Sequence, residues 1–174
     1  MDTGSDRNME KKKAVYRRGF LLRCSVIAGC ILAVICLVGF IPQHGSQMFP
    51  AVKDGDLMLT FKMTGRYHAG AVVGYRSPEG TVRLGRIVAG PGDIVDITEE
   101  GRLLINDRVV SEEIFYLTVF EGSRIGELPL KVPEDTYYIL NDHRSEADDS
   151  REYGVIPKSE LLGEGFWMFR RRDF

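Results

Sequence analysis

The chain has 174 residues, of which 44% are hydrophobic and 28% charged, and its formal net charge at pH 7 is −2. This composition supplies enough apolar sequence for one packed domain and excludes a chain that is disordered along most of its length. Residues 24–174 contain 16 basic and 22 acidic side chains. Such an acidic balance disfavours nucleic acid as a partner.

The first predicted element is a transmembrane helix over residues 24–42, nineteen residues that carry no charge. A helix needs roughly 20 apolar residues to cross a bilayer. Residues 1–23 hold seven Lys or Arg against three Asp or Glu, and the positive-inside rule therefore places them in the cytoplasm. We expect a single-pass protein of the cell membrane, with residues 43–174 as one extracellular domain.

Two other interpretations of the apolar run remain open. A cleaved secretory signal has a shorter apolar core of about 7–15 residues and ends in a small-x-small site, which the sequence after Phe40 lacks. A buried core helix would show a polar face, and this run has none. All three cysteines, Cys24, Cys30 and Cys36, lie inside the run, so we expect no disulfide, metal site or cofactor in the external domain.

The remaining sequence indicates a mainly β domain. Short runs rich in Val, Ile, Tyr and Phe alternate with turn residues, which favours antiparallel sheets in a coiled, barrel-like arrangement. Turns are predicted at Pro91-Gly92-Asp93 and at Asn106-Asp107. Within residues 112–135, Phe115, Tyr116 and Phe120 form either part of the core or an exposed recognition surface, and we expect the core. The predicted strands cover residues 56–63, 71–76, 82–89, 94–98, 103–105, 136–140 and 165–170.

Four motifs follow one another along this region. They are Met48-Phe49-Pro50, Gly55-Asp56 before a strand, Arg86-Ile87-Val88-Ala89-Gly90-Pro91-Gly92-Asp93, and residues 141–154, which read Asn-Asp-His-Arg-Ser-Glu-Ala-Asp-Asp-Ser-Arg-Glu-Tyr-Gly. In this order, behind an N-terminal anchor, they resemble the type I signal peptidases, serine peptidase family S26. The resemblance covers nearly the whole chain and implies the family's coiled β fold.

The two residues that would perform the chemistry are absent. In the family a serine nucleophile directly precedes Met-x-Pro, and a lysine general base directly precedes the arginine of the next motif. Here these positions hold Gln47 and Gly85. Ala147 also stands where the family usually has a serine, Ala89 replaces a usual glycine, and Asn141 and His143 replace a usual Gly and Asn.

A serine–lysine pair works only if the lysine amine is neutral and can take the serine proton. Gln47 has no hydroxyl, Gly85 has no side chain, and Arg86 stays protonated. We expect the loss of lysine to open space in the groove. Ser46 is the fallback nucleophile, although alternation along a strand points it away from the position of its neighbour. Other conceivable bases for Ser46 are His44, His68, His143 and the external lysines Lys53, Lys62, Lys131 and Lys158.

Several motif residues are expected to be structural instead of catalytic. By resemblance to active relatives, Asp142 forms an ion pair with Arg86 and ties two segments together. The other structural motif residues are Met48, Pro50, Arg144, Asp149, Ser150 and Arg151.

The resemblance extends to the catalytically degenerate signal-peptidase-like proteins of Gram-positive pilus assembly. It implies a pseudoenzyme that acts as a membrane-anchored chaperone, binds pilin subunits or secreted precursor segments, and works beside a sortase. The alternative is an active signal peptidase with a non-standard site around Ser46. A third possibility is a structural subunit that modulates another peptidase in the same membrane.

Overall fold

The computed structural model describes residues 3–63, 65–110, 117–118 and 128–171, with side chains from residue 16 onward. It divides into two units, Met1–Leu37 and Val38–Phe174. The predicted core residues Phe115, Tyr116 and Phe120 lie outside the described residues.

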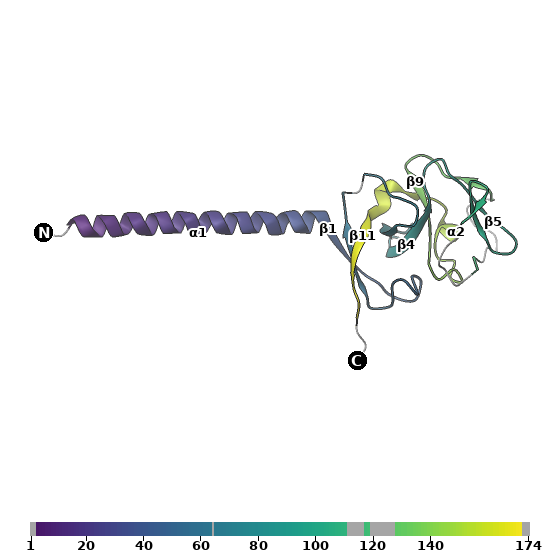
Figure 1. The fold of residues 1–174 in the computed structure, drawn as a ribbon, viewed down its shortest axis with the longest axis horizontal. Coiled ribbons are helices and arrows are strands. Elements are labelled where there is room, and N and C mark those ends of the chain that lie inside the picture. Colours follow the sequence, from purple (N-terminus) through teal and green to yellow (C-terminus); the bar gives the residue numbers. More distant parts are fainter. Residues whose placement is uncertain (1–2, 64, 111–116, 119–127, 172–174) are drawn as a thin grey trace. The chain divides into compact units, whose positions relative to one another are not determined.

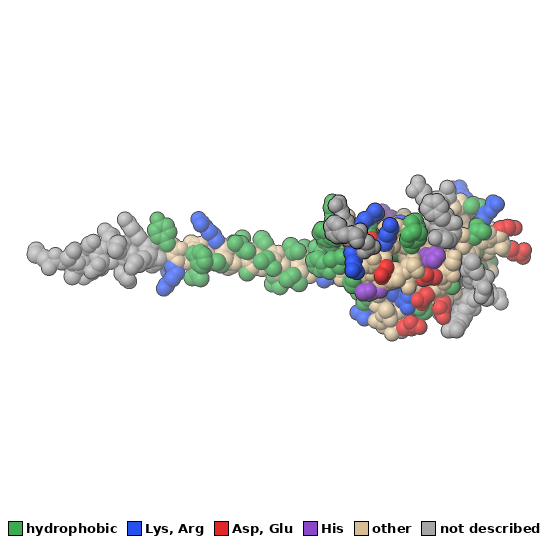
Figure 2. Space-filling model, turned by 90° about the horizontal axis from the view of Figure 1, so that it is seen from below, with side chains coloured by type: hydrophobic (Ala, Val, Ile, Leu, Met, Phe, Trp, Pro, Cys, Tyr) green, Lys and Arg blue, Asp and Glu red, His purple; other side chains and the backbone are tan. Residues whose placement is uncertain are grey.

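The first unit is the helix α1, Thr3–Leu37. Its stretch Tyr16–Leu37 is long and apolar enough to cross a membrane. Hydrophobic side chains lie along it in Figure 2, and basic side chains project from its N-terminal part. The predicted helix over residues 24–42 is wrong at its C-terminal end, because Val38–Pro42 form the strand β1 and pair with β2. Hydropathy does not separate the two states here, since an apolar strand and an apolar helix read alike.

The second unit contains a seven-stranded antiparallel sheet in the order β1-β2-β11-β3-β4-β9-β10. The last long strand, β11, is drawn yellow in Figure 1 and lies between β2 and β3. The predicted mainly β fold with a curled sheet is confirmed. The strands are β1 (Val38–Pro42), β2 (Leu57–Phe61), β3 (Val72–Arg76), β4 (Val82–Ala89), β9 (Thr136–Leu140), β10 (Ile156–Pro157) and β11 (Leu161–Phe169).

A smaller sheet with the order β7-β6-β5-β8 completes the unit. Its strands are β5 (Ile94–Ile97), β6 (Leu103–Ile105), β7 (Arg108–Val109) and β8 (Leu130–Lys131). The predicted turn at Asn106-Asp107 joins β6 to β7, and both residues have positive φ, of 52° and 61°. This left-handed pair is what a tight two-residue hairpin requires.

Five short elements were not predicted from the sequence. They are β7, β8, β10, the helix α2 (Ser150–Tyr153) and the 3₁₀ turn η1 (Lys158–Glu160). Two to four residues carry too little periodic pattern to be recognised, and tertiary contacts decide their conformation.

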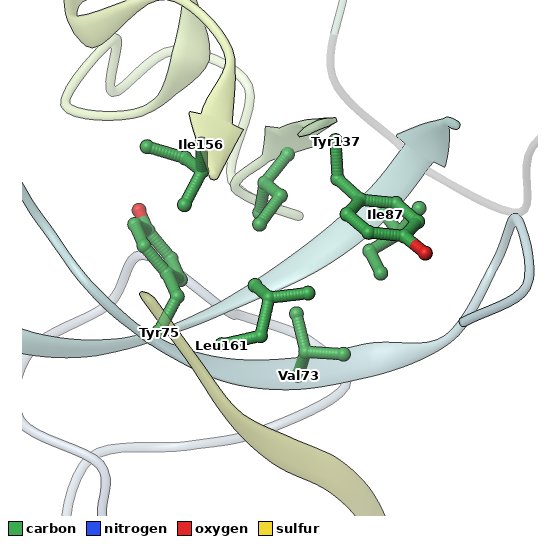
Figure 3. Close-up of a cluster of buried hydrophobic side chains, with 7 residues drawn as sticks. Val73, Tyr75, Ile87, Tyr137, Ile156 and Leu161 are labelled. Atoms are coloured by element: carbon green, nitrogen blue, oxygen red, sulfur yellow. The ribbon is translucent and has the colours of Figure 1, made fainter. Parts of the chain in front are cut away.

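The core that lies beside β3, β4 and β9 is shown in Figure 3. Tyr75 is fully buried in it, and its hydroxyl has no hydrogen-bond partner among the described residues. Burial, followed by the negative charge of Asp149, raises the pKa of Tyr75. A second core packs around β5 and β6, and a third around Met48 and Met58.

Tyr75→Phe is expected to raise the free energy of unfolding by about 1 kcal/mol, because it removes a buried hydroxyl that makes no bond. The folded protein keeps the Tyr75 proton to a higher pH than the unfolded chain, in which tyrosine titrates near about 10. Stability therefore falls as the pH rises above about 10, and the variant should lose less of it. Denaturant unfolding of the full chain in detergent at pH 7 and pH 11 measures both effects. A variant less stable than the parent at pH 7 contradicts this account.

Candidate functional site

A cleft of about 230 Å³ lies between the segment that follows β1, the start of β4 and the residue after β9. Gln47 lines it, so the cleft lies where the family places its nucleophile. The lining residues are Pro42, Gln43, His44, Gln47, Thr81, Val82, Arg83, Leu84 and Asn141. Of these, sequence analysis singled out Gln47, and it noted His44 and Asn141 without assigning them to a cleft.

The Gln47 side chain is held by its neighbours. Its Oε1 accepts a hydrogen bond of 3.2 Å from Gln43 Nε2, and its carboxamide lies over Gly45. The Gln47 carbonyl oxygen accepts a bond of 2.9 Å from the backbone N–H of His143. A carboxamide at this position supplies neither an attacking oxygen nor a removable proton at ordinary pH.

Gly85 leaves no room for a side chain. A Cβ atom built on it would lie 2.5 Å from Ile139 Cγ2 and 3.0 Å from Tyr75 Cε1. The expected open space is therefore wrong, because Ile139 and Tyr75 fill the volume beside the glycine. Residue 85 cannot carry a general base unless the core in Figure 3 repacks.

Ser46 does not line the cleft. Its hydroxyl donates a hydrogen bond of 2.6 Å to Glu146 Oε1, and the same oxygen lies 3.1 Å from His143 Nδ1. The carboxylate thus stands between the hydroxyl and the imidazole, which is not the order of a serine–histidine–acid triad. His44 lines the cleft, but no contact between it and Ser46 is found among the described residues.

The predicted ion pair between Arg86 and Asp142 is confirmed. Arg86 Nε and Nη2 donate to the two carboxylate oxygens of Asp142 at 2.7 and 2.6 Å. The Asp142 side chain is only 2% exposed, so this bidentate pair is shielded from water on its acidic side. It connects β4 to the loop that follows β9.

The other charged residues of the last motif form a buried network. The Asp149 side chain caps α2 and accepts hydrogen bonds from the Arg151 guanidinium. It also accepts a hydrogen bond of 2.9 Å from the backbone N–H of Asn141. Ser150 Oγ accepts the N–H of Ile139 in β9. Arg144 Nε donates to the Asn141 carbonyl, and Arg151 Nη1 donates to the Arg144 carbonyl. These contacts fix the loop that carries Asn141 to the cleft.

The two motif residues next to Gln47 anchor its other side. Met48 is fully buried in the third core, and Pro50 is half-buried. Together with the network around Asp149 they hold both walls of the cleft in place.

Arg83 is a cleft residue that sequence analysis missed. Its guanidinium bonds to Asp148, which also accepts the Tyr153 hydroxyl. Burial lowers the pKa of Arg83, but the charge and hydrogen bond of Asp148 together with the nearby Tyr153 and Tyr75 outweigh burial, and the net direction is upward. Burial and the bond to Asp148 raise the pKa of Tyr153. Arg83 therefore stays charged, and Asp148 balances it.

These features are those of a signal peptidase fold with an altered centre. Residues 17–169 match the family described as signal peptidase, peptidase S26. The chain belongs to this family.

Its relatives include signal peptidase I U of Bacillus subtilis (strain 168), 29% identical over 171 residues that cover 91% of this chain and 90% of the relative. Signal peptidase I P of Bacillus subtilis subsp. natto is 25% identical over 171 residues, with 92% and 91% covered. A crystal structure of a signal peptidase I from Enterococcus faecalis V583 aligns with a TM-score of 0.49 and 23% identity, over 57% of this chain and 96% of that one.

Proposed function

We propose that this protein is a non-catalytic signal peptidase homologue that binds segments of secreted proteins. The observation that carries the proposal is the packed surroundings of Gly85, where even a Cβ atom would lie 2.5 Å from Ile139 Cγ2. The lysine that is the family's general base is missing at residue 85, and Ile139 and Tyr75 fill the volume beside that position. With Gln47 in the nucleophile position, the attack of a serine hydroxyl on which the family's peptide hydrolysis depends cannot occur there.

Binding does not require either lost residue. The cleft borders β4, and peptides bind beside strands through main-chain hydrogen bonds and small side-chain pockets. The loops on both sides of the cleft are fixed by the Arg86–Asp142 pair and the Asp149 network, so the cleft is pre-organised. A pre-organised site loses less conformational entropy on binding.

The proposed role is that of an accessory factor or chaperone for sortase-dependent pilus assembly, with pilin subunits or secreted precursor segments as ligands and a sortase as a neighbour. The apolar stretch Tyr16–Leu37 would anchor the chain in the cell membrane. The excess of Lys and Arg in residues 1–23 would keep the N-terminus in the cytoplasm and place Val38–Phe174 outside.

One variant tests the binding role in cells in which the gene has been replaced. Val82 lies on the rim of the cleft and is 43% exposed, so Val82→Arg should block the cleft without disturbing the core. We expect pilus polymerisation, measured by immunoblotting of cell-wall extracts, to be lost. Val109→Arg is the matched control, because Val109 is exposed on β7 outside the cleft. Equal polymerisation with both variants would contradict the proposal.

One observation favours a second candidate, an active peptidase that uses Ser46. The Glu146 carboxylate 2.6 Å from Ser46 Oγ is a proton acceptor that the sequence did not reveal. The full chain in detergent, mixed with a precursor that carries an Ala-x-Ala site, distinguishes the two. The binding role predicts no cleavage; cleavage that disappears on Ser46→Ala would establish the peptidase.

A further inference from the structure

Three carboxamide side chains, those of Gln43, Gln47 and Asn141, line the cleft. Gln43 is 4% exposed and Asn141 is 1% exposed. Buried carboxamides normally satisfy both their oxygen and their nitrogen. In this cleft each of the three uses one end and leaves the other without a partner among the described residues.

The surroundings of Gln43 and Asn141 settle which end is used. Gln43 Nε2 lies 3.1 Å from the His44 carbonyl oxygen and 3.3 Å from that of Gly45. Asn141 Nδ2 lies 3.3 Å from the carbonyl oxygens of Glu146 and Asp148. A carbonyl oxygen only accepts, so the nitrogen of each carboxamide must face these atoms. The oxygens Gln43 Oε1 and Asn141 Oδ1 are therefore the ends left over.

Gln47 takes the opposite orientation. Gln43 Nε2 also lies 3.2 Å from Gln47 Oε1, so its two N–H bonds are shared among this atom and the two backbone carbonyls. A nitrogen in place of Gln47 Oε1 would set two donors against each other, so that atom is the oxygen. Gln47 Nε2 is then the end left over, and it is a donor. Among the described residues, the three carboxamides offer the cleft two acceptors, from Gln43 and Asn141, and one donor group, from Gln47.

This set complements one chemical group closely. A primary carboxamide has two N–H bonds and one carbonyl oxygen, which pair with two acceptors and one donor. A carboxylate would face two oxygens, and the Arg83 guanidinium, which also lines the cleft, is already paired with Asp148. An aliphatic side chain would leave all three polar ends unpaired, at a cost. The cleft of about 230 Å³ is smaller than the roughly 300–1,000 Å³ of sites that enclose a small molecule, so it fits one side chain of a longer ligand.

We propose that this cleft reads an Asn or Gln side chain of the bound polypeptide. The inference rests on the proposed binding function and names the group that the cleft selects. Gln47, which stands in the nucleophile position, then acts as a specificity residue. The Gln43 side chain positions Gln47 through the hydrogen bond from Gln43 Nε2 to Gln47 Oε1.

The test uses the full chain in detergent and a series of eight-residue peptides. The peptides consist of Ala, Val and Gly, with acetyl and N-methylamide ends, so that only the central residue varies, as Asn, Gln, Asp, Leu or Lys. Binding is followed by NMR chemical-shift titration. The Asn or Gln peptide should bind at least about tenfold more tightly than the Asp and Leu peptides, which corresponds to one well-formed hydrogen bond in a desolvated site.

Gln47→Glu keeps the shape of the side chain and the acceptor for Gln43, but replaces the donor of the carboxamide set with a further acceptor. The Asn peptide should then bind about tenfold more weakly, and the Lys peptide should gain affinity. A misfolded variant would not bind the Lys peptide more tightly than the parent does. Titration with the Lys peptide therefore distinguishes a change in specificity from loss of the fold. Lys131→Gln, exposed on β8 and outside the cleft, lowers the charge by the same one unit and should change neither affinity.

Equal affinities for the Asn and Leu peptides, or a preference that Gln47→Glu leaves unchanged, would overturn the carboxamide assignment. If no peptide of the series binds but secreted precursors still cross-link to the chain, the assignment fails and the binding function stands. If the precursors fail to cross-link as well, both fail.

Discussion

Gly85→Ala is expected to lower the free energy of unfolding by about 2 kcal/mol, a large effect for one methyl group. The new Cβ would meet Ile139 Cγ2 at 2.5 Å and Tyr75 Cε1 at 3.0 Å, and extra volume in a packed core typically costs about 1–3 kcal/mol. Denaturant unfolding of the full chain in detergent measures it. Gly65→Ala is the matched control, because no atom of the described residues lies within 4 Å of a Cβ at Gly65, and it should change stability by less than about 0.5 kcal/mol.

A double-mutant cycle shows whether Ile139 causes the penalty. Ile139→Ala removes the atom that Gly85→Ala would meet, so the glycine substitution should cost clearly less in that background. Additive effects of the two substitutions would mean that the crowding arises elsewhere, and would contradict the packing described for Gly85.

The same crowding predicts that the family's catalytic pair cannot simply be restored. Gln47→Ser combined with Gly85→Lys should yield a destabilised chain that does not cleave a precursor with an Ala-x-Ala site. The control is the variant that carries Gly85→Lys alone. If the double variant cleaves the precursor and this control does not, the core repacks around a lysine more easily than its contacts indicate.

Arg86→Ala is expected to lower the free energy of unfolding by about 3 kcal/mol. It removes both bonds to Asp142, whose carboxylate is 2% exposed, and a buried charge without its partner is strongly destabilising. Urea denaturation is the measurement. The exposed pair Arg76–Glu160, separated by 3.8 Å, provides the control: Arg76→Ala should cost less than about 1 kcal/mol.

Asp142→Asn completes the comparison. It keeps the shape of the side chain but leaves the Arg86 guanidinium opposite a neutral amide, so it should also destabilise the chain. The loss should be smaller than that from Arg86→Ala, because the Arg86 side chain is 24% exposed and retains contact with water. Arg86→Ala with the same effect as Arg76→Ala would show that the pair contributes no more than a surface ion pair.

Much of the fold could be predicted because the local sequence pattern and the local backbone conformation agree along many of its strands and turns. The predicted runs 82–89, 103–105 and 136–140 coincide with β4, β6 and β9. The turn at Asn106-Asp107 followed from residue types that tolerate positive φ. The Arg86–Asp142 pair came from the resemblance, because two charges 56 residues apart carry no local signal.

The site was less predictable, because its decisive contacts join distant segments. The missing side chain at Gly85 suggested open space, and only the packing of β3 and β9 against β4 shows that Tyr75 and Ile139 fill it. The Ser46–Glu146 bond spans 100 residues. The orientation of the cleft carboxamides depends on backbone carbonyls that no residue type reveals.

The position of β11 between β2 and β3 has a consequence for biosynthesis. Neither neighbour can complete its hydrogen-bond ladder until Leu161–Phe169 has left the ribosome, so the larger sheet cannot close before this strand has emerged. A nascent or truncated form that lacks these nine residues would present two unpaired edges, each a template for aggregation. Protection of these edges until β11 has emerged is therefore a requirement that the topology imposes.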